Sequence, residues 1–159
     1  MDQLLSLLSE DARLTNAELA AALSTSEEDV AARIAAYEAS GVIKGYKAIV
    51  DWDKTDRDYV NARIELKVIP QKDMGFEEIA GIIAKFDEVE SVYLMSGTCD
   101  IALTVTGKSF KDVAMFVAHR LAPLESVQST STSFVLRTYK VLGVFVALDD
   151  TDEREVTSL

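Results

Sequence analysis

Residues 14–46 of the chain read LTNAELAAALSTSEEDVAARIAAYEASGVIKGY, which contains the signals for two short helices joined by a turn. Thr15, with Glu18 three positions later, forms a capping box and predicts a helix start. The polar pair Ser24-Thr25 predicts the turn, and apolar residues recur after it at helical spacing. They are Val30, Ile34 and Tyr37. This layout predicts a helix-turn-helix, a motif that commonly inserts its second helix into the major groove of DNA.

The flanking sequence extends this motif into a small domain. Leucines at positions 4, 5, 7 and 8 predict a helix before it, and Gly41 supplies the left-handed residue that ends the last helix. Around Gly45, apolar residues predict short strand or wing segments. These are Val42, Ile43, Tyr46, Ile49 and Val50. We therefore expect a winged helix-turn-helix domain over residues 1–50.

The charge of the last helix argues against tight DNA binding. That helix carries Glu27, Glu28, Asp29 and Glu38 but only one base, Arg33. Acids also outnumber bases over residues 1–58, and the 159-residue chain has a net charge of −11. DNA-binding surfaces normally carry the opposite charge, because Lys and Arg release the counterions of the phosphates. The acidic balance lowers the expected affinity without removing it, since the local placement of charge matters more than the sum.

Composition excludes several other classes of protein. No apolar run reaches the roughly 18 residues that cross a bilayer, and Met1-Asp2-Gln3 does not begin a signal peptide. A single cysteine, Cys99, excludes a disulfide within the chain, and with a single histidine, His119, it cannot build a Cys/His metal site. We expect a cytoplasmic protein with no membrane partner, no metal and no cofactor.

The pattern changes after residues 51–58, a charged and aperiodic stretch that we interpret as a linker. Period-two and helical patterns then alternate along the chain. They predict strands at 60–69, 89–95, 101–105 and 127–135, helices at 76–86 and 110–121, and a further apolar strand at 141–148. The order strand-helix-strand-strand-helix-strand is the ferredoxin-like βαββαβ arrangement, so the expected class is α+β.

Residues 59–148 are assigned to this second domain and residues 149–159 to an acidic tail. Helices pack on one face of such a sheet and leave the other face open. We expect that face to be apolar and covered by a second subunit, which predicts a homodimer.

Three segments together carry a family resemblance: LTNAELA at 14–20, SGVIKGYKAIVD at 40–51, and SGTCD at 96–100 before a strand. In this order and spacing they resemble the Lrp/AsnC (feast/famine) transcriptional regulators. The resemblance implies a DNA-binding regulator rather than an enzyme. It also implies dimers that can assemble into octamers, with an amino acid or related small molecule bound at subunit interfaces.

The resemblance further implies where this effector binds. The turn at 96–100 aligns with the family's glycine-plus-acid turn beside the pocket, and residues 129–132 align with a polar stretch that closes it. The expected contacts are Gly97, Thr98, Cys99, Asp100, Ser129, Thr130, Ser131 and Thr132. A carboxylate can accept from an ammonium, while N–H groups and hydroxyls can bind a carboxylate. The family often has an aromatic residue where Cys99 stands, and an ordinary β-turn with solvated hydroxyls remains the alternative.

Two interpretations of the helix-turn-helix stay open. In the first, polar and basic residues meet DNA, and alanines of the last helix contact thymine methyl groups. The expected DNA contacts are Ser24, Thr25, Ser26 and Arg33, with Arg13, Lys44, Lys47 and Lys54 on phosphates. In the second, Arg33 pairs with Asp29 one turn earlier and the alanines only favour the helix.

The two interpretations lead to different functions. The first predicts a sequence-specific DNA-binding regulator that responds to an amino acid or related metabolite. The second predicts a metabolite-binding oligomer whose helix-turn-helix has lost DNA reading. An enzyme is a third class, because the siroheme decarboxylases resemble this architecture. One histidine and the lack of a recognisable acid–base pair disfavour it, and we assign no catalytic residue.

Overall fold

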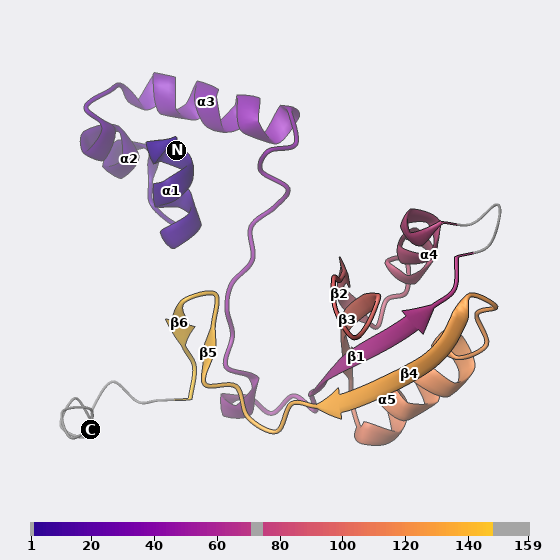
Figure 1. The fold of residues 1–159 in the computed structure, drawn as a ribbon. Coiled ribbons are helices and arrows are strands. Elements are labelled where there is room, and N and C mark those ends of the chain that lie inside the picture. Colours follow the sequence, from indigo (N-terminus) through magenta and orange to yellow (C-terminus); the bar gives the residue numbers. More distant parts are fainter. Residues whose placement is uncertain (1, 71–74, 148–159) are drawn as a thin grey trace, which may run out of the picture. The chain divides into compact units, whose positions relative to one another are not determined.

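The computed structural model describes residues 2–70 and 75–147. The chain divides into two compact units, Met1–Ile49 and Val50–Leu159 (Figure 1). No helix in the described ranges is long and apolar enough to cross a membrane.

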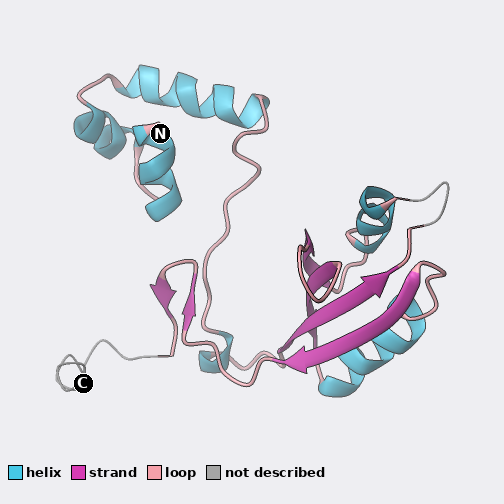
Figure 2. Ribbon diagram, viewed as in Figure 1, coloured by secondary structure: helices cyan, strands magenta, loops and turns pink. Residues whose placement is uncertain are grey.

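Three helices form the first unit: α1 (Gln3–Glu10), α2 (Asn16–Leu23) and α3 (Glu27–Ala39) (Figure 2). The predicted capping box is confirmed, since the Thr15 hydroxyl accepts from the Glu18 N–H and the Glu18 carboxylate accepts from the Thr15 N–H. A small core joins the three helices, formed by Leu4, Leu19, Ala20 and Val30 with partly buried side chains around them. Burial of each large apolar side chain contributes about 1.5–3 kcal/mol. Because the core is small, the total stabilisation of this unit by burial is small too.

The strand or wing segments expected around Gly45 are absent. Gly41, at a φ of 71°, ends α3, and residues 44–51 have no regular secondary structure. A strand needs a neighbouring strand for its backbone N–H and C=O groups, and the described part of the chain places none beside this segment. A short 3₁₀ turn, η1 (Trp52–Lys54), follows.

The second unit is built on a four-stranded sheet with two helices. In chain order it contains β1 (Val60–Val68), α4 (Phe76–Ile83), β2 (Val89–Leu94), β3 (Ile101–Gly107), α5 (Phe110–Phe116), the π-helical turn η2 (Val117–Leu121) and β4 (Val127–Phe134). The strands lie in the order β2-β3-β1-β4 and each neighbouring pair is antiparallel. The predicted ferredoxin-like order is therefore confirmed.

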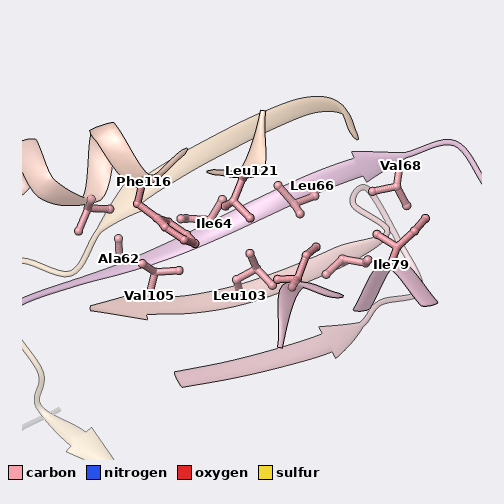
Figure 3. Packing of buried hydrophobic residues seen from close by; sticks show 12 residues of the cluster. Ala62, Ile64, Leu66, Val68, Ile79, Leu103, Val105, Phe116 and Leu121 are labelled. Carbon is pink, nitrogen blue, oxygen red and sulfur yellow. The ribbon is translucent and has the colours of Figure 1, made fainter. Parts of the chain in front are cut away.

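Alternate residues of the strands form the main core under the helices. Ala62, Ile64 and Leu66 of β1 are fully buried. On β3, Val105 is fully buried and Leu103 is 1% exposed. Figure 3 shows these side chains directed toward Phe116 and Leu121 from the α5–η2 region and toward Ile79 of α4. The period of two explains why one face of each strand enters this core.

The other face of the sheet is polar along β1 and β4, where the expectation of an apolar second face is wrong. On β2 and β3 the same face includes Tyr93 and Ala102. β1 contributes Arg63, Glu65 and Lys67, which alternate with its buried residues. Ser129, Ser131 and Ser133 of β4 stand opposite Lys67, Glu65 and Arg63 in the ladder. Because opposite residues share a face, these six form one surface, which we call the open face.

The strand predicted over 141–148 is also wrong, because this part of the chain forms two short strands. β5 (Lys140–Val141) and β6 (Val144–Phe145) pair as a short hairpin. Leu142 and Gly143 between them have φ values of 46° and 87°, the positive values that a tight two-residue hairpin turn needs. Leu148 and the acidic tail 149–159 lie outside the described residues.

Candidate DNA-contacting helix and effector site

α3 buries one side and exposes an acidic, alanine-rich side. Val30 is fully buried and Ile34 and Tyr37 pack against the same core. Glu27 and Glu28 lie in the exposed first turn, where their charge favours the positive end of the helix dipole. The remaining exposed side chains on this helix are mostly alanines.

Arg33, the only base of α3, is bound by two carboxylates of its own unit. Its Nη2 lies 3.1 Å from both Asp2 Oδ1 and Asp2 Oδ2, and its Nη1 lies 3.6 Å from Asp29 Oδ2. The side chain is 35% exposed. The Asp29 pairing is the contact that the second sequence interpretation predicts. The Asp2 pairing joins residues 31 positions apart, so no local pattern could reveal it.

Asp2 is fixed by several bonds at once. It is the N-cap of α1, accepting from the N–H groups of Leu4 and Leu5, and it accepts a hydrogen bond from the Tyr37 hydroxyl. The Tyr37 bond, together with the N–H and Arg33 bonds, holds the pKa of Asp2 below its ordinary value. The same bond to Asp2 raises the pKa of Tyr37.

Two of the three predicted turn hydroxyls are used locally. Ser26 is the N-cap of α3 and accepts from the Asp29 N–H, and the Thr25 hydroxyl donates to the Asp29 carboxylate at 3.1 Å. Ser24 has a left-handed φ of 54° and its hydroxyl has no partner within the described ranges.

The other predicted bases lie outside the helices. Arg13 is exposed in the loop before α2, and Lys47 is exposed in the extended segment after α3. A Cβ built at Gly41 would come 2.7 Å from Lys44 Nζ, so the Lys44 ammonium lies by the C-terminal end of α3. Lys54 belongs to the second unit, where its Nζ lies 3.7 Å from Asp51 Oδ2.

The predicted effector turn lies between β2 and β3 and ends in an anchored carboxylate. Gly97 has a φ of 153°, which L side chains rarely adopt, and Cys99 is buried. Asp100 Oδ2 accepts from the Val68 N–H at 3.0 Å, and Lys67 Nζ lies 3.5 Å from Asp100 Oδ1. Asp100 thus holds the end of β1, with 27% of its side chain still exposed.

The predicted residues of β4 are divided between two faces. Thr130 and Thr132 stand opposite Leu66 and Ile64 and are half-buried on the helix-covered side. Ser129 and Ser131 are exposed on the open face. One surface of a single chain therefore cannot present all four.

One end of the open face brings three polar residues into a row. Leu66 pairs with both Ile101 and Thr130, so the next position of β1, Lys67, lies between Asp100 and Ser129. Neighbouring strands lie about 4.8 Å apart, which puts Asp100 and Ser129 roughly 10 Å from each other. Lys67 was not among the predicted site residues, although its alternation with buried Leu66 and Val68 places it on this face.

A cavity of about 490 Å³ lies at the opposite end of the sheet, lined by Arg57, Asp58, Tyr59, Asp87, Glu88, Thr106, Gly107 and Lys108. It contains none of the predicted effector residues. Burial, together with the nearby Glu90 charge, raises the pKa of Tyr59 in its wall. Within the described residues, no group of three His, Cys, Asp or Glu side chains can hold a metal ion.

Comparison with protein families matches both units. Residues 2–38 match the AsnC-type helix-turn-helix domain, and residues 61–144 match the Lrp/AsnC ligand binding domain. The chain is 40% identical to the uncharacterized HTH-type transcriptional regulator YugG of Bacillus subtilis, covering 98% of this chain and 95% of that protein. It is 31% identical to the regulatory protein AsnC of Haemophilus influenzae, covering 83% and 87% of the two chains.

Solved structures show the same fold. The transcriptional regulator NMB0573 of Neisseria meningitidis, crystallised with L-Met, superposes with a TM-score of 0.71 at 26% identity, covering 94% of this chain and 96% of that one. LrpC of Bacillus subtilis superposes with a TM-score of 0.63 at 25% identity, covering 88% and 97%.

Proposed function

The chain belongs to the Lrp/AsnC family of transcriptional regulators, and we propose which of its residues meet DNA and which meet the effector. The family assigns it a helix-turn-helix for DNA and a C-terminal domain that binds an amino acid ligand; its members are regulators, not enzymes. A regulator of this kind acts where the chromosome is, so we propose a cytoplasmic location.

On the DNA side, three bases carry most of the proposed contact. Arg13, Lys44 and Lys47 have no ion pair within the described ranges, so each is available for a phosphate. Ser24, whose hydroxyl has no partner among the described residues, is the proposed polar contact of the turn, with Thr25 and Ser26 beside it. Arg33 joins them only when it leaves its carboxylate partners.

On the effector side, the row Asp100–Lys67–Ser129 is the observation that carries the proposal. A zwitterionic amino acid presents an ammonium and a carboxylate. Asp100 accepts from the ammonium, while Lys67 and the Ser129 hydroxyl bind the carboxylate. Gly97, Thr98 and Cys99 form the adjoining wall, and Ser131 continues the surface. Thr130 and Thr132 support β4 from its other side.

We further propose that the open face lies against a second subunit in a homodimer that can assemble into octamers. Positive and negative charges alternate along β1, through Arg63, Glu65 and Lys67. A second copy related by a two-fold axis can therefore place opposite charges against each other. An effector at the edge of such an interface favours one assembly and so alters DNA affinity.

Calorimetric titration with a panel of amino acids tests the effector site. Asp100→Asn keeps an acceptor for the Val68 N–H but removes the charge that an ammonium needs. We expect this variant to bind the preferred amino acid at least tenfold more weakly, since charged hydrogen bonds contribute about 1.5–3 kcal/mol. Glu77→Gln, an exposed change of equal charge on α4, is the matched control and is expected to bind normally. Equal affinities for wild type and Asp100→Asn would reject the assignment.

A further inference from the structure

Asp2 lies where it can control the only base of α3. Resting on the proposed DNA-binding function, we propose that the Asp2 carboxylate competes with DNA for Arg33 and thereby lowers the affinity of the protein for DNA. Asp2 would then be a residue that tunes DNA binding from within the helical unit, without itself touching the DNA.

The first argument is the geometry of the guanidinium. A guanidinium can donate hydrogen bonds to two acceptors side by side, either from Nη1 and Nη2 or from Nε and Nη2. Nη2 takes part in both arrangements, and in this structure Nη2 is bound to both oxygens of Asp2 at 3.1 Å. Nη1 is also engaged, by Asp29 at 3.6 Å. A guanine edge or a phosphate that approaches these two nitrogens must therefore compete with carboxylates already bound to them.

The second argument is that Asp2 is well anchored without Arg33. Its carboxylate caps α1 through two backbone N–H groups and accepts from Tyr37. The Tyr37 bond and the two N–H bonds also favour the ionised form of this carboxyl, since they lower its pKa. Asp2 thus stays in position when Arg33 moves away, and it is available to take Arg33 back.

The third argument is charge. Two carboxylates surround one guanidinium, so this part of α3 presents net negative charge to an approaching phosphate. A phosphate must therefore compete with Asp2 for the charge of Arg33. The side chains of Arg33 and Asp2 are 35% and 30% exposed, and partly exposed pairs of this kind are weak enough for DNA to compete with.

The test measures DNA affinity by fluorescence anisotropy on the full chain, without an N-terminal tag, against the DNA upstream of its own gene from ~50 to ~200 mM salt. Asp2→Asn removes the charge and keeps the cap, because Asn is as good an N-cap as Asp. Glu28→Gln is the matched control, an equal change of charge in the exposed first turn of α3. Asp2→Asn combined with Arg33→Ala shows whether Asp2 acts through Arg33.

We expect Asp2→Asn to bind about two- to fivefold more tightly than wild type, and more tightly than Glu28→Gln, because a partly exposed ion pair is worth up to about 1 kcal/mol. The slope of log affinity against log salt is expected to steepen by up to ~0.9 per subunit, the contribution of one new phosphate contact. In the Arg33→Ala background, Asp2→Asn is expected to change affinity no more than Glu28→Gln does.

Three outcomes overturn the proposal. Weaker binding by Asp2→Asn would mean that Asp2 positions Arg33 for DNA instead of withholding it. Equal gains for Asp2→Asn and Glu28→Gln would leave only a general effect of charge. If wild type and Asp2→Asn, both folded by circular dichroism, fail to bind at ~50 mM salt, the proposed DNA contacts fail as well. Should Asp2→Asn unfold, Asp2→Ser replaces it, since serine also caps a helix but is too short to reach Arg33.

Discussion

α3 and the Asp100 end of the open face each present one charged residue suited to a partner, and each of these residues already has an opposite charge beside it. Arg33 is bound through both terminal nitrogens by Asp2 and Asp29. In the described part of the chain, Asp100 is paired with Lys67 at 3.5 Å and accepts from one backbone N–H. A guanidinium paired with two carboxylates binds DNA in competition with them, whereas a carboxylate–ammonium pair can open around a zwitterion that supplies both charges.

The two units also differ in the depth of their cores. Among the residues that the structure describes, the buried core of the helical unit has four members and that of the sheet unit has twelve. Because stability follows the apolar area removed from water, the helical unit is the less stable of the two. The largest expected effect follows from this difference.

Leu19→Ala removes a fully buried side chain from the smaller core. We expect it to destabilise the helical unit by about 2–5 kcal/mol, enough to unfold most of it while the sheet unit stays folded. Urea unfolding followed by circular dichroism and by the fluorescence of Trp52, which lies in the sheet unit, separates the two transitions. A single shared transition would show that the units unfold together.

Lys67→Gln tests the other side of the comparison. Lys67 supplies the proposed positive charge for the effector carboxylate, so we expect about a tenfold loss of effector affinity, equivalent to ~1.4 kcal/mol. Calorimetric titration measures it, with Lys85→Gln, beyond the end of α4, as the control of equal charge. A normal affinity for Lys67→Gln would show that Lys67 does not bind the effector carboxylate. The proposed difference between this site and Arg33 of α3 would then be lost.

Thr15→Ala removes the hydroxyl half of the capping box in the helical unit. Loss of an N-cap costs about 1 kcal/mol, and the expected result is a lower midpoint for the helical transition in urea with no change in the sheet transition. Thr132→Ala makes the same Thr→Ala change on β4, in the sheet unit, and serves as the control. A shift of both transitions would contradict the independence of the two units.

Acid is expected to weaken the helical unit by a smaller amount. Bonds from Thr15 to Glu18, and from Tyr37 and two N–H groups to Asp2, hold the pKa values of both carboxyls below their ordinary values. A lowered pKa means that the stabilisation is complete above the unfolded-state pKa and is lost as the pH falls through the folded-state pKa. We therefore expect helix content to fall as the pH drops below about 4. Circular dichroism of wild type and Asp2→Asn measures it, and an equally steep loss in both would remove Asp2 from the explanation.

Local patterns in the sequence predicted most of the fold. Thr15 and Glu18 are three positions apart, so their capping box is legible in one turn of sequence, and the alternation of β1 reveals its buried face. The single strand expected over 141–148 was wrong because Leu142 takes a positive φ and the chain turns there. A leucine in the sequence gives no sign of a positive φ. The second face was expected to be apolar, but along β1 it carries Arg63, Glu65 and Lys67, which alternate with the core residues of that strand.

The state of the charged groups was harder to predict than their position. Arg33 and Asp2 are 31 positions apart, and Lys67 and Asp100 are 33 apart. Whether a charge is free or paired depends on tertiary packing, which spacing does not report. The sequence therefore places Arg33 on the correct helix and Asp100 on the correct turn without indicating that each is already paired.

The most direct test of this regulator is the salt dependence with which the wild-type chain binds the DNA upstream of its gene. With Arg33 withheld and phosphate contacts from Arg13, Lys44 and Lys47, we predict specific binding whose log–log salt slope is about −2.7 per subunit, or ~0.9 for each contact. Lys44→Ala should reduce the slope by about one contact. Absence of binding at ~50 mM salt, by a folded chain that still binds its amino acid, would contradict this and leave the helix-turn-helix as a scaffold that no longer reads DNA.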